Sequence, residues 1–375
     1  MLTRALTKRF IRSNSTLARG VWADFSKRPE SLKIKNDALK QGVLGKHLDG
    51  PASYTNRDRR AYYKTPLELD ETFVMSYEIL NEEAANVYKK VEELEKELAS
   101  TTDEAQIKEI KDQIDNTLIE AEIQNPEVLF NVEYSDSDAL DRSHPVYRQF
   151  LEQKWRDYDL MLTMQRLEQL HVIPDTLPTV DPKVDVKVKF THNTDERFVG
   201  WIAPGELLPA KAVSQPPTIR IQEYERVDGQ NLYTVLIVNP DTPDLEKNSF
   251  STTLHYGLVN YPLDNVNNTI HPAKVLENEE QHVIKDYVPL VPEKNAEKQR
   301  ACLWVFRQSK QLEVNAVAAE KFDIRSFVQA NDLLPVGGYV WRQKFDRSVN
   351  EVRDAYGLGR GRVFHRVRGR DPLVE

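Results

Sequence analysis

The sequence of 375 residues contains a single cysteine, Cys302, and no long uninterrupted run of apolar residues. One cysteine excludes an internal disulfide framework and suits a reducing compartment. Because Cys302 lies within the apolar stretch ACLWVF, we interpret it as a buried strand residue rather than a reactive thiol. A membrane-spanning helix needs roughly 18 or more consecutive apolar residues, so the sequence predicts no membrane span.

The motifs of the common enzyme classes are also missing. The sequence has no glycine-rich phosphate loop, no nucleophile elbow and no closely spaced His/Cys ligand set. His271 and His282 stand too far apart, without a third ligand, to predict a metal site. The glycines of GLGRGR (357–362) do not follow an apolar strand, and we interpret this stretch as a flexible or RNA-facing tail. We therefore predict a protein that is not an enzyme and uses no metal or cofactor.

Charge is abundant but unevenly distributed. The net charge of −8 argues against a nucleic-acid binder if the chain is taken as a whole. Residues 1–64, however, contain 15 Lys/Arg and 5 Asp/Glu, whereas residues 67–141 contain 5 Lys/Arg and 22 Asp/Glu. Residues 353–370 contain six arginines and one acid, Asp354. This segregation predicts different partners for different segments.

The first 20 residues are rich in arginine and in hydroxyl side chains and contain no acid. On a helix, Leu2, Leu6 and Phe10 would share one side. These features are typical of a mitochondrial presequence and predict import into the mitochondrial matrix. A plain basic tail is the alternative, while a secretory signal would need a continuous apolar centre that this stretch lacks.

Residues 21–66 form a basic segment with several aromatic residues and little periodicity. Such a composition predicts either a disordered linker or an arm that becomes ordered on a partner. We favour the arm, because aromatic side chains can stack on RNA bases while neighbouring Lys and Arg neutralise phosphates. The candidate rRNA-binding residues of the arm are Lys27, Arg28, Lys33, Lys35 and Lys46.

The region 67–172 has helical spacing and is strongly acidic. Apolar residues recur every three or four positions over 87–98 and 107–118, which predicts a helical hairpin or one broken helix. Between these stretches, Thr101 and Glu104 fit a capping box. The acidic residues suit either a solvated face or a docking surface for basic proteins.

A third, long helix is expected to start at Ser143, with Pro145 in its first turn, and to end near His171, before Pro174. Its centre is rich in large apolar residues, which we interpret as packing against the domain that follows.

After this helix the pattern becomes that of β-strands. The stretch VDVKVKF alternates apolar and polar residues, and further short apolar runs are separated by Pro, Gly and Asn. Asp228 and Gly229 signal a turn, and Asp323 is placed to cap a short helix near the end of the region. We predict an antiparallel β-sandwich over residues 173–350.

Four sequence blocks in this region, taken in order, resemble the phosphatidylethanolamine-binding protein (PEBP) family. The stretch 205–244 contains LYTVLIVNPDTPD, which is similar to the family strand and loop "LYTLVLTDPDAP". LHYGLVN (254–260) is similar to "HHFLVVN", and QRACLWVFRQ (299–308) to "HRYVWLVYEQ". FDIRSFVQANDLLPVGGYVW (322–341) is similar to the family's final block. The resemblance covers roughly 180–345 and implies the family's fold.

Members of this family bind phosphate or phosphoryl head groups in a small pocket, but the resemblance implies that the pocket is degenerate here. The first pocket carboxylate of the family is replaced by Asn239, and its His-Arg-Tyr block by Gln299, Arg300 and Ala301. The chain therefore lacks one acid, one histidine and one tyrosine, so no obligate small-molecule ligand is expected. The pocket positions are Asn239, Asp241, Pro243, His255, Gln299 and Ala301.

The retained residues of the pocket have a structural interpretation. Asp241 is expected to fold back on nearby backbone amides and fix its turn, and His255 to be a satisfied core histidine. A working anion site is the alternative, with Asn239 and Arg300 as further donors.

The fold class is therefore α+β: a PEBP-like antiparallel β-sandwich with an N-terminal extended arm, a helical extension made of a hairpin and a long helix, and a basic C-terminal tail. The predicted order is a presequence (1–20), a basic extended arm (21–66), an acidic helical region (67–172), a PEBP-like β domain (173–350) and an Arg-rich tail (351–375). The tail is too poor in apolar residues to fold alone, and it is expected to order on RNA. Its candidate rRNA-binding residues are Arg360, Arg362, Arg366, Arg368 and Arg370.

This architecture is similar to that of the PEBP-like proteins of the mitochondrial large ribosomal subunit, in their fungal form. The resemblance implies a structural role in the central protuberance, with contacts to rRNA and to neighbouring ribosomal proteins. The alternative is a free PEBP-type binder of phosphoryl ligands, or a protease or kinase inhibitor, in the matrix.

Overall fold

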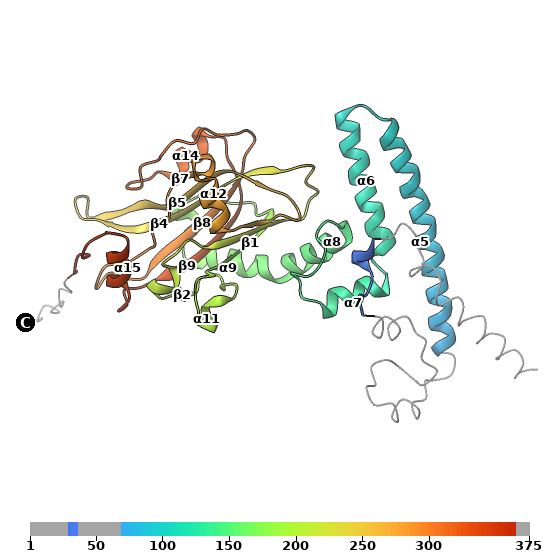
Figure 1. Cartoon of the computed structure of the whole chain (residues 1–375), viewed down its shortest axis with the longest axis horizontal. Helices are drawn as coiled ribbons and strands as arrows, with labels where there is room; N and C mark the ends of the chain where they lie inside the picture. The colour runs from blue at the N-terminus through green and yellow to red at the C-terminus, as the bar shows by residue number, and fades with distance from the viewer. Residues whose placement is uncertain (1–28, 37–68, 365–375) are drawn as a thin grey trace, which may run out of the picture. The chain divides into compact units, whose positions relative to one another are not determined.

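The computed structural model describes residues 29–36 and 69–364, within two compact units, Met1–Gln153 and Lys154–Glu375 (Figure 1). The predicted presequence lies outside the described residues, as does most of the predicted arm. The predicted rRNA-binding residues outside them are Lys27, Arg28, Lys46, Arg366, Arg368 and Arg370.

The N-terminal unit contains a helical hairpin formed by α5 (Leu69–Ser100) and α6 (Glu104–Glu122). The two helices pack through the apolar stripe that the sequence predicts, and the buried residues of this stripe include Val91, Ile110 and Ile114. Because the stripe is narrow, much of the remaining surface of the hairpin is exposed. The predicted hairpin is thus confirmed.

The turn between α5 and α6 differs from the prediction. The residue that caps α6 is Asp103, whose carboxylate accepts a hydrogen bond from the backbone N–H of Ala105 at 3.2 Å. The hydroxyl of Thr101 instead donates to the carbonyl of Glu97 at 2.8 Å and belongs to the end of α5. The predicted capping box of Thr101 and Glu104 is wrong, because a carboxylate directly before the helix takes the capping position.

A short piece of the predicted arm is anchored on the other helices of the N-terminal unit. These elements are η1 (Glu30–Leu32), α7 (Pro126–Tyr134) and α8 (Pro145–Lys154). The side chain of Leu32 is fully buried in a cluster with Val128 and Val146. The carbonyl of Leu32 also accepts a hydrogen bond from the side-chain amide of Asn131 at 3.3 Å. This part of the arm is therefore ordered by the protein's own helices.

Helical residues continue without a break from α8 through η2 (Trp155–Asp159) into α9 (Leu160–Gln169). This run starts at Pro145, two residues after the predicted start at Ser143, so Pro145 lies in its first turn as predicted. The five residues of η2 form a π-helical segment within the run. In the part of the chain that the structure describes, every helix is too short or too polar to cross a membrane.

The C-terminal unit contains two sheets. The smaller has the strand order β1 (Val184–Lys189), β3 (Thr218–Glu223), β6 (Thr269–Ile270). The larger has the order β2 (Leu207–Leu208), β9 (Leu334–Gln343), β8 (Gln299–Arg307), β4 (Asn231–Asp244), β5 (Ser249–Leu263), β7 (Val283–Lys285). Neighbouring strands of the described sheets run antiparallel, apart from β2 and β9, which are parallel. These sheets and the helical extension confirm the predicted α+β class.

The larger sheet is covered on both faces, which explains why residues 301–306 of its central strand β8 are apolar at every position. On β8, Leu303 and Val305 join the core shared with the smaller sheet. Cys302 and Trp304 point to the opposite face, where they belong to a second core. That core also contains residues of α9 and of α14 (Ile324–Ala330). The unit therefore has three layers: small sheet, large sheet and helices.

The beginning of the predicted tail is ordered on the C-terminal unit. Val349 and Val352 of α15 (Val349–Ala355) pack against Ala210. Beyond this helix, the guanidinium of Arg353 donates to the carbonyl of Gly359 at 3.0 Å. Arg353 is thus engaged within the fold.

The remaining short elements are α10 (Val172–Asp175), α11 (Glu196–Val199), η3 (Ala210–Val213), α12 (Pro272–Glu277) and α13 (Glu279–His282).

Candidate functional site

The positions of the family pocket lie where β4 and β8 run side by side in the large sheet. Asn239 and Gln299 are both buried there. The side-chain amide of Asn239 donates to Gln299 Oε1 and to Thr242 Oγ1, each at 3.2 Å. Its Oδ1 accepts a hydrogen bond from the backbone N–H of Asp241 at 2.9 Å. Asn239, which replaces the family's acid, thus uses its donors and acceptor within the chain.

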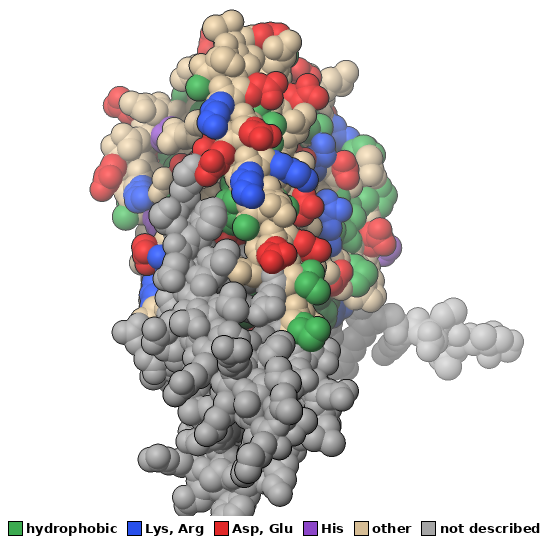
Figure 2. Space-filling view, turned by 90° about the vertical axis from the view of Figure 1, so that its right-hand side faces the viewer, with side chains coloured by type: hydrophobic (Ala, Val, Ile, Leu, Met, Phe, Trp, Pro, Cys, Tyr) green, Lys and Arg blue, Asp and Glu red, His purple; other side chains and the backbone are tan. Residues whose placement is uncertain are grey.

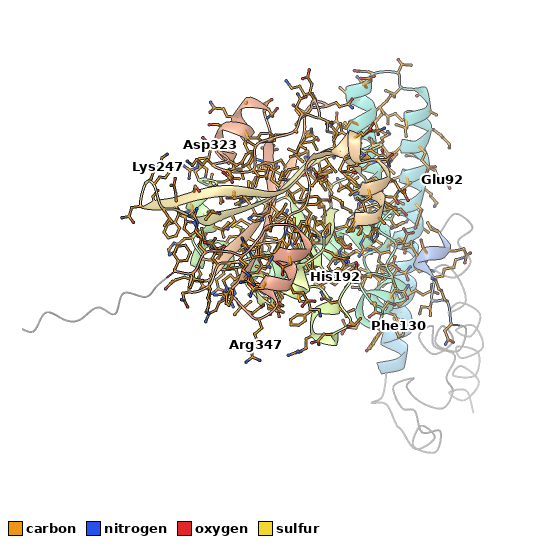
Figure 3. The ribbon with its side chains drawn as sticks, turned by 60° about the vertical axis from the view of Figure 1, so that its left-hand side comes forward. Glu92, Phe130, His192, Lys247, Asp323 and Arg347 are labelled. Atoms are coloured by element: carbon orange, nitrogen blue, oxygen red, sulfur yellow. The ribbon has the colours of Figure 1, made fainter. Side chains whose placement is uncertain are left out.

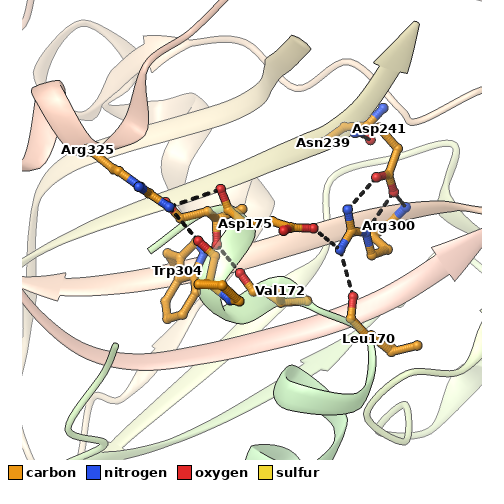
Figure 4. A network of polar contacts seen from close by, with 10 residues as sticks. Leu170, Val172, Asp175, Asn239, Asp241, Arg300, Trp304 and Arg325 are labelled. Carbon is orange, nitrogen blue, oxygen red and sulfur yellow. Dashed lines mark hydrogen bonds and ion pairs between the residues drawn. The ribbon is translucent and has the colours of Figure 1, made fainter. Parts of the chain in front are cut away.

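Arg300 is the centre of the site, and its guanidinium is clamped by the protein's own acceptors (Figure 4). It binds the carboxylate of Asp241 through two nitrogens, at 2.8 and 2.5 Å. A further nitrogen contacts Asp175 Oδ2 at 2.8 Å and the carbonyl of Leu170 at 2.7 Å. Only 16% of the Arg300 side chain and 20% of the Asp241 side chain are exposed. Such a bidentate pair is among the strongest hydrogen-bonded ion pairs in proteins.

The charges of this cluster disfavour an anion. One guanidinium faces two carboxylates, so the cluster carries a net negative charge that would repel a phosphoryl group. Burial alone would lower the pKa of Arg300, but the hydrogen bonds to Asp241 and Asp175 outweigh it and raise that pKa above its usual value. The positive charge of Arg300 is therefore permanent and already neutralised.

His255 lies at a register shift between β4 and β5, where it is the extra residue of a β-bulge. Its Nδ1 lies 2.8 Å from the carbonyl oxygen of Val288, and its own carbonyl accepts from the N–H of Val288 at 2.9 Å. Its Nε2 is buried and has no hydrogen-bond partner among the residues that the structure describes. Burial lowers the pKa of His255 to about 4. At neutral pH the ring is therefore uncharged, with the N–H on Nδ1 and no donor left for an anion.

The network around Arg300 fixes α10 to the large sheet. Besides the contacts of Arg300, the Trp304 indole donates to Thr176 Oγ1 at 3.0 Å. The guanidinium of Arg325, from α14, donates to the carbonyl of Thr176 at 2.9 Å and to that of Pro174 (Figure 4). Side chains from two elements thus hold the chain that joins α9 to β1.

The structure joins some of the predicted pocket residues and separates others. Asn239 and Gln299 share a hydrogen bond, and Asp241 is tied to them through Asn239. Ala301 is buried in the sheet core, His255 bonds to a different segment, and Pro243 pairs with Phe250 on β5.

The expected role of Asp241 is also corrected. Its carboxylate does not bond to the amides of its own turn but to the side chain and the backbone N–H of Arg300. The turn is fixed by Asn239 instead. The partner of Arg300 that sequence reasoning missed is Asp175, which lies 125 positions away. A signal for the pair was present, because the family acid is replaced at 239 while Asp241 and an arginine at 300 are kept.

Neither a metal site nor a reactive thiol is found in this region. No group of three or more His, Cys, Asp or Glu side chains is arranged to hold a metal within the described residues. Cys302 is fully buried in the sheet, and burial raises the pKa of its thiol well above the usual value.

The predicted rRNA-binding residues that can be described differ in their surroundings. Lys33 forms an ion pair with Glu30 at 2.5 Å and is only 19% exposed, whereas Lys35 is exposed. Arg360 is exposed on the ordered start of the tail, and Arg362 lies two positions further along it. The side chain of Arg362 is exposed as well.

Because the cluster around Arg300 is closed and negatively charged, we expect phosphorylethanolamine at millimolar concentration to leave the melting temperature of the protein unchanged. A ligand present at a hundredfold excess over its dissociation constant would stabilise the native state by about 2.7 kcal/mol. Thermal melting of wild type and His255→Ala with and without the ligand measures this. An upward shift in wild type that disappears in the variant would show a working pocket.

Comparisons with known proteins give one family match and two related sequences. A family model described as phosphatidylethanolamine-binding protein matches residues 199–341. The chain is 30% identical over 229 residues to the large ribosomal subunit protein mL38 of Schizosaccharomyces pombe, covering 57% of this chain and 70% of that protein. It is 24% identical over 202 residues to a putative odorant-binding protein A5 of Drosophila melanogaster, covering 51% and 85%.

Among solved structures, a phosphatidylethanolamine-binding protein from Plasmodium vivax is similar, with a TM-score of 0.37 and 16% identity, covering 49% of this chain and 98% of that one.

Proposed function

Because this chain belongs to the family of the large ribosomal subunit protein mL38, we propose that it is a structural component of the mitochondrial large ribosomal subunit. The observation that carries the proposal is the 30% identity, which extends over 70% of the relative. Within the subunit, the protein contacts rRNA and neighbouring ribosomal proteins of the central protuberance and supports mitochondrial translation. A non-enzymatic role and a mitochondrial location, both predicted from the sequence, agree with this family.

The state of the family pocket supports a structural role over a ligand-binding one. In a free binder of phosphoryl ligands, the donors of the pocket would have to be available. Here Asn239 and Arg300 are both bonded within the chain, and His255 is held neutral by burial. The alternative of a PEBP-type ligand binder is therefore disfavoured.

The helical hairpin supports a division of contacts between RNA and protein. Residues 67–141, which include both helices of the hairpin, contain 22 Asp/Glu and 5 Lys/Arg. Figure 2 shows acidic side chains in red among the described residues. A surface with this excess of acid is repelled by phosphates. The hairpin therefore faces solvent or a ribosomal protein, while the arm and the tail contribute contacts to RNA.

Sedimentation of a mitochondrial lysate in a sucrose gradient tests the proposal. The protein should migrate with the large ribosomal subunit at moderate salt. A slow peak of monomer size would instead favour the free ligand binder.

We expect replacement of the five tail arginines (360, 362, 366, 368 and 370) by alanine to release the protein from large subunits at lower salt than wild type. Each phosphate that is no longer neutralised should reduce the slope of log affinity against log salt by about 0.7–0.9. The melting temperature should not change, because Arg360 is exposed. Salt washing of isolated subunits, followed by immunoblotting, gives the measurement.

A matched control is Arg353→Ala. Arg353 belongs to the same basic stretch, but its guanidinium bonds to the carbonyls of Gly359, Leu358 and Val291. This variant should lower the melting temperature instead. If the five-arginine variant stays bound at the same salt as wild type, the tail does not anchor the protein to RNA.

A further inference from the structure

The outer face of the small sheet carries a row of cations that the sequence pattern alone does not single out. On β1, Val184, Val186 and Val188 enter the core. The side chains between them therefore point to the other face. In the register of the sheet, Lys187 pairs with Arg220 and Lys189 pairs with Thr218. Lys189 and Arg220 are thus diagonal neighbours on one face.

In the half of this face around Lys187, the positive charge is neutralised by acids of the same chain. Lys187 forms ion pairs with Asp159 at 2.7 Å and with Asp185 at 3.7 Å. The Asp185 side chain is only 11% exposed. This half is therefore a structural contact between the small sheet and η2.

The other half is built around a tryptophan. The ring of Trp201 lies over Lys189, with Nζ 4.6 Å from the ring centroid, and over Arg220, with Cζ at 4.4 Å. Trp201 is only partly buried, and Lys189 has no carboxylate partner among the residues that the structure describes. Arg220 is only 8% exposed, so its charge is screened less by salt than that of a surface arginine.

Two more basic residues extend this half of the face at the end of β6. His271 directly follows that strand, and Lys274 lies one turn later in α12; both are exposed. Burial lowers the pKa of His271, and the charges of Lys274 and Lys189 lower it further. Lys189 and Lys274 therefore create a positive potential at His271, and the lowered pKa keeps the His271 ring mostly uncharged at neutral pH.

We propose that Lys189, Trp201, Arg220, His271 and Lys274, the Trp201 surface, form an rRNA-binding platform in which an unpaired base stacks on Trp201 and adjacent phosphates bind Lys189 and Lys274. The proposal rests on the proposed function, since it names a ribosomal RNA as the ligand. An aromatic ring flanked by cations is the arrangement by which proteins hold single-stranded nucleic acid. Unpaired bases of RNA are recognised by such stacking, while the cations neutralise the backbone.

An acidic protein segment fits the Trp201 surface less well. Its carboxylates would pair with Lys189 and Lys274 but would gain little from the face of an indole ring. RNA uses the ring and the charges together, because each nucleotide carries a flat base and a phosphate. The two lysines of this surface, Lys189 and Lys274, also contrast with the acidic helical hairpin, which suits RNA poorly.

Ultraviolet crosslinking of intact large subunits, followed by trypsin digestion and mass spectrometry, tests the ligand directly. Cleavage after Arg197 and Lys211 yields a peptide, 198–211, in which Trp201 is the only aromatic residue besides Phe198. A nucleotide adduct on this peptide is expected. An adduct to another protein at this position, or no nucleotide adduct there while other subunit proteins give theirs, would overturn the proposal.

Substitutions measure the strength of the contact in salt-washed subunits. Trp201→Leu should lower the affinity about tenfold or more at every salt concentration, because base stacking is removed. The pair Lys189→Gln and Lys274→Gln should reduce the slope of log affinity against log salt by about 1.5. Trp201→Tyr keeps an aromatic ring and should bind like wild type.

The matched control is Lys247→Gln, which removes an exposed lysine at the tip of the hairpin between β4 and β5 (Figure 3). It should bind like wild type. The platform is absent if the Trp201→Leu variant and the double lysine variant both bind like this control. If Trp201→Leu also lowers the melting temperature, its weaker binding could come from misfolding. The double lysine variant and the crosslink then decide whether the platform exists. Absence of wild-type protein from large subunits would contradict the proposed function itself, which the sedimentation test reveals separately.

Discussion

Replacing Arg300 with methionine should lower the free energy of unfolding by about 2–3 kcal/mol, although methionine has a similar length and suits an apolar site. The substitution leaves the carboxylate of Asp241 without its cation in a position that is only 20% exposed. It also removes the donor to the carbonyl of Leu170. Removal of one partner of a fully buried pair costs about 3–5 kcal/mol. The expected value is smaller, because the other partner, Asp175, is 45% exposed.

A double-mutant cycle separates the ion pair from the packing of the arginine stem. Asp241→Asn alone should destabilise the protein less than Arg300→Met, because Arg300 keeps Asp175. The double variant should be more stable than the sum of the two single effects predicts, by about 1 kcal/mol or more. Urea unfolding followed by circular dichroism measures all four proteins.

The control for this cycle is Arg197→Met. Arg197 forms an ion pair of similar length with Asp195, at 2.6 Å, but its side chain is 78% exposed. Exposed pairs contribute little to stability, so the urea midpoint of this variant should equal that of wild type. If Arg300→Met behaves like Arg197→Met, the cluster around Arg300 does not hold α10 to the sheet.

Local patterns in the sequence predicted the elements of the chain well, because they depend on near neighbours. The alternation of β1 and the apolar stretch of β8 follow from which faces are buried. The cap of α14 follows from one carboxylate: Asp323 accepts from the N–H groups of Arg325 and Ser326, as predicted. Gly229 has a φ of +85°, which agrees with the predicted turn at Asp228 and Gly229.

The partners of the site residues could not be predicted, because they are distant in sequence. Arg300 reaches Asp241 over 59 positions and Asp175 over 125. The resemblance to the PEBP family located the pocket positions but describes a site that binds a ligand. The resemblance does not show which side chain of this protein lies where a ligand would bind. Similarly, Lys189, Trp201 and Arg220 come together only through the pairing of β1 with β3.

Acid should destabilise the protein through His255, and the direction follows from its pKa in the two states. In the unfolded chain the pKa is near 6.5, whereas in the folded protein it is lowered to about 4, first by burial. Between these values the unfolded state binds a proton that the folded state does not. Stability is therefore fully present above pH 6.5 and declines as the pH falls towards 4. The contribution amounts to about 2 kcal/mol between pH 7 and pH 5.

Burial sets this direction, and it outweighs the hydrogen bond to Val288, which on its own raises the pKa of His255. The neutral ring donates from Nδ1 to the carbonyl of Val288, at 2.8 Å, so added acid must protonate Nε2. Nε2 is buried without a partner among the described residues, so the new charge would have no compensating acceptor.

Urea unfolding of wild type, His255→Gln and His255→Leu at a series of pH values from 7 to 5 tests this account. Glutamine can still donate to the carbonyl of Val288, whereas leucine cannot, so the two variants should differ in stability at pH 7. Neither can titrate, however, and both should lack the decrease of about 2 kcal/mol that wild type shows on acidification. Because other groups titrate equally in all three proteins, the difference between the curves isolates His255. Three parallel curves would mean that Nε2 is protonated as easily in the folded protein as in the unfolded chain, and that His255 is not buried in its neutral form.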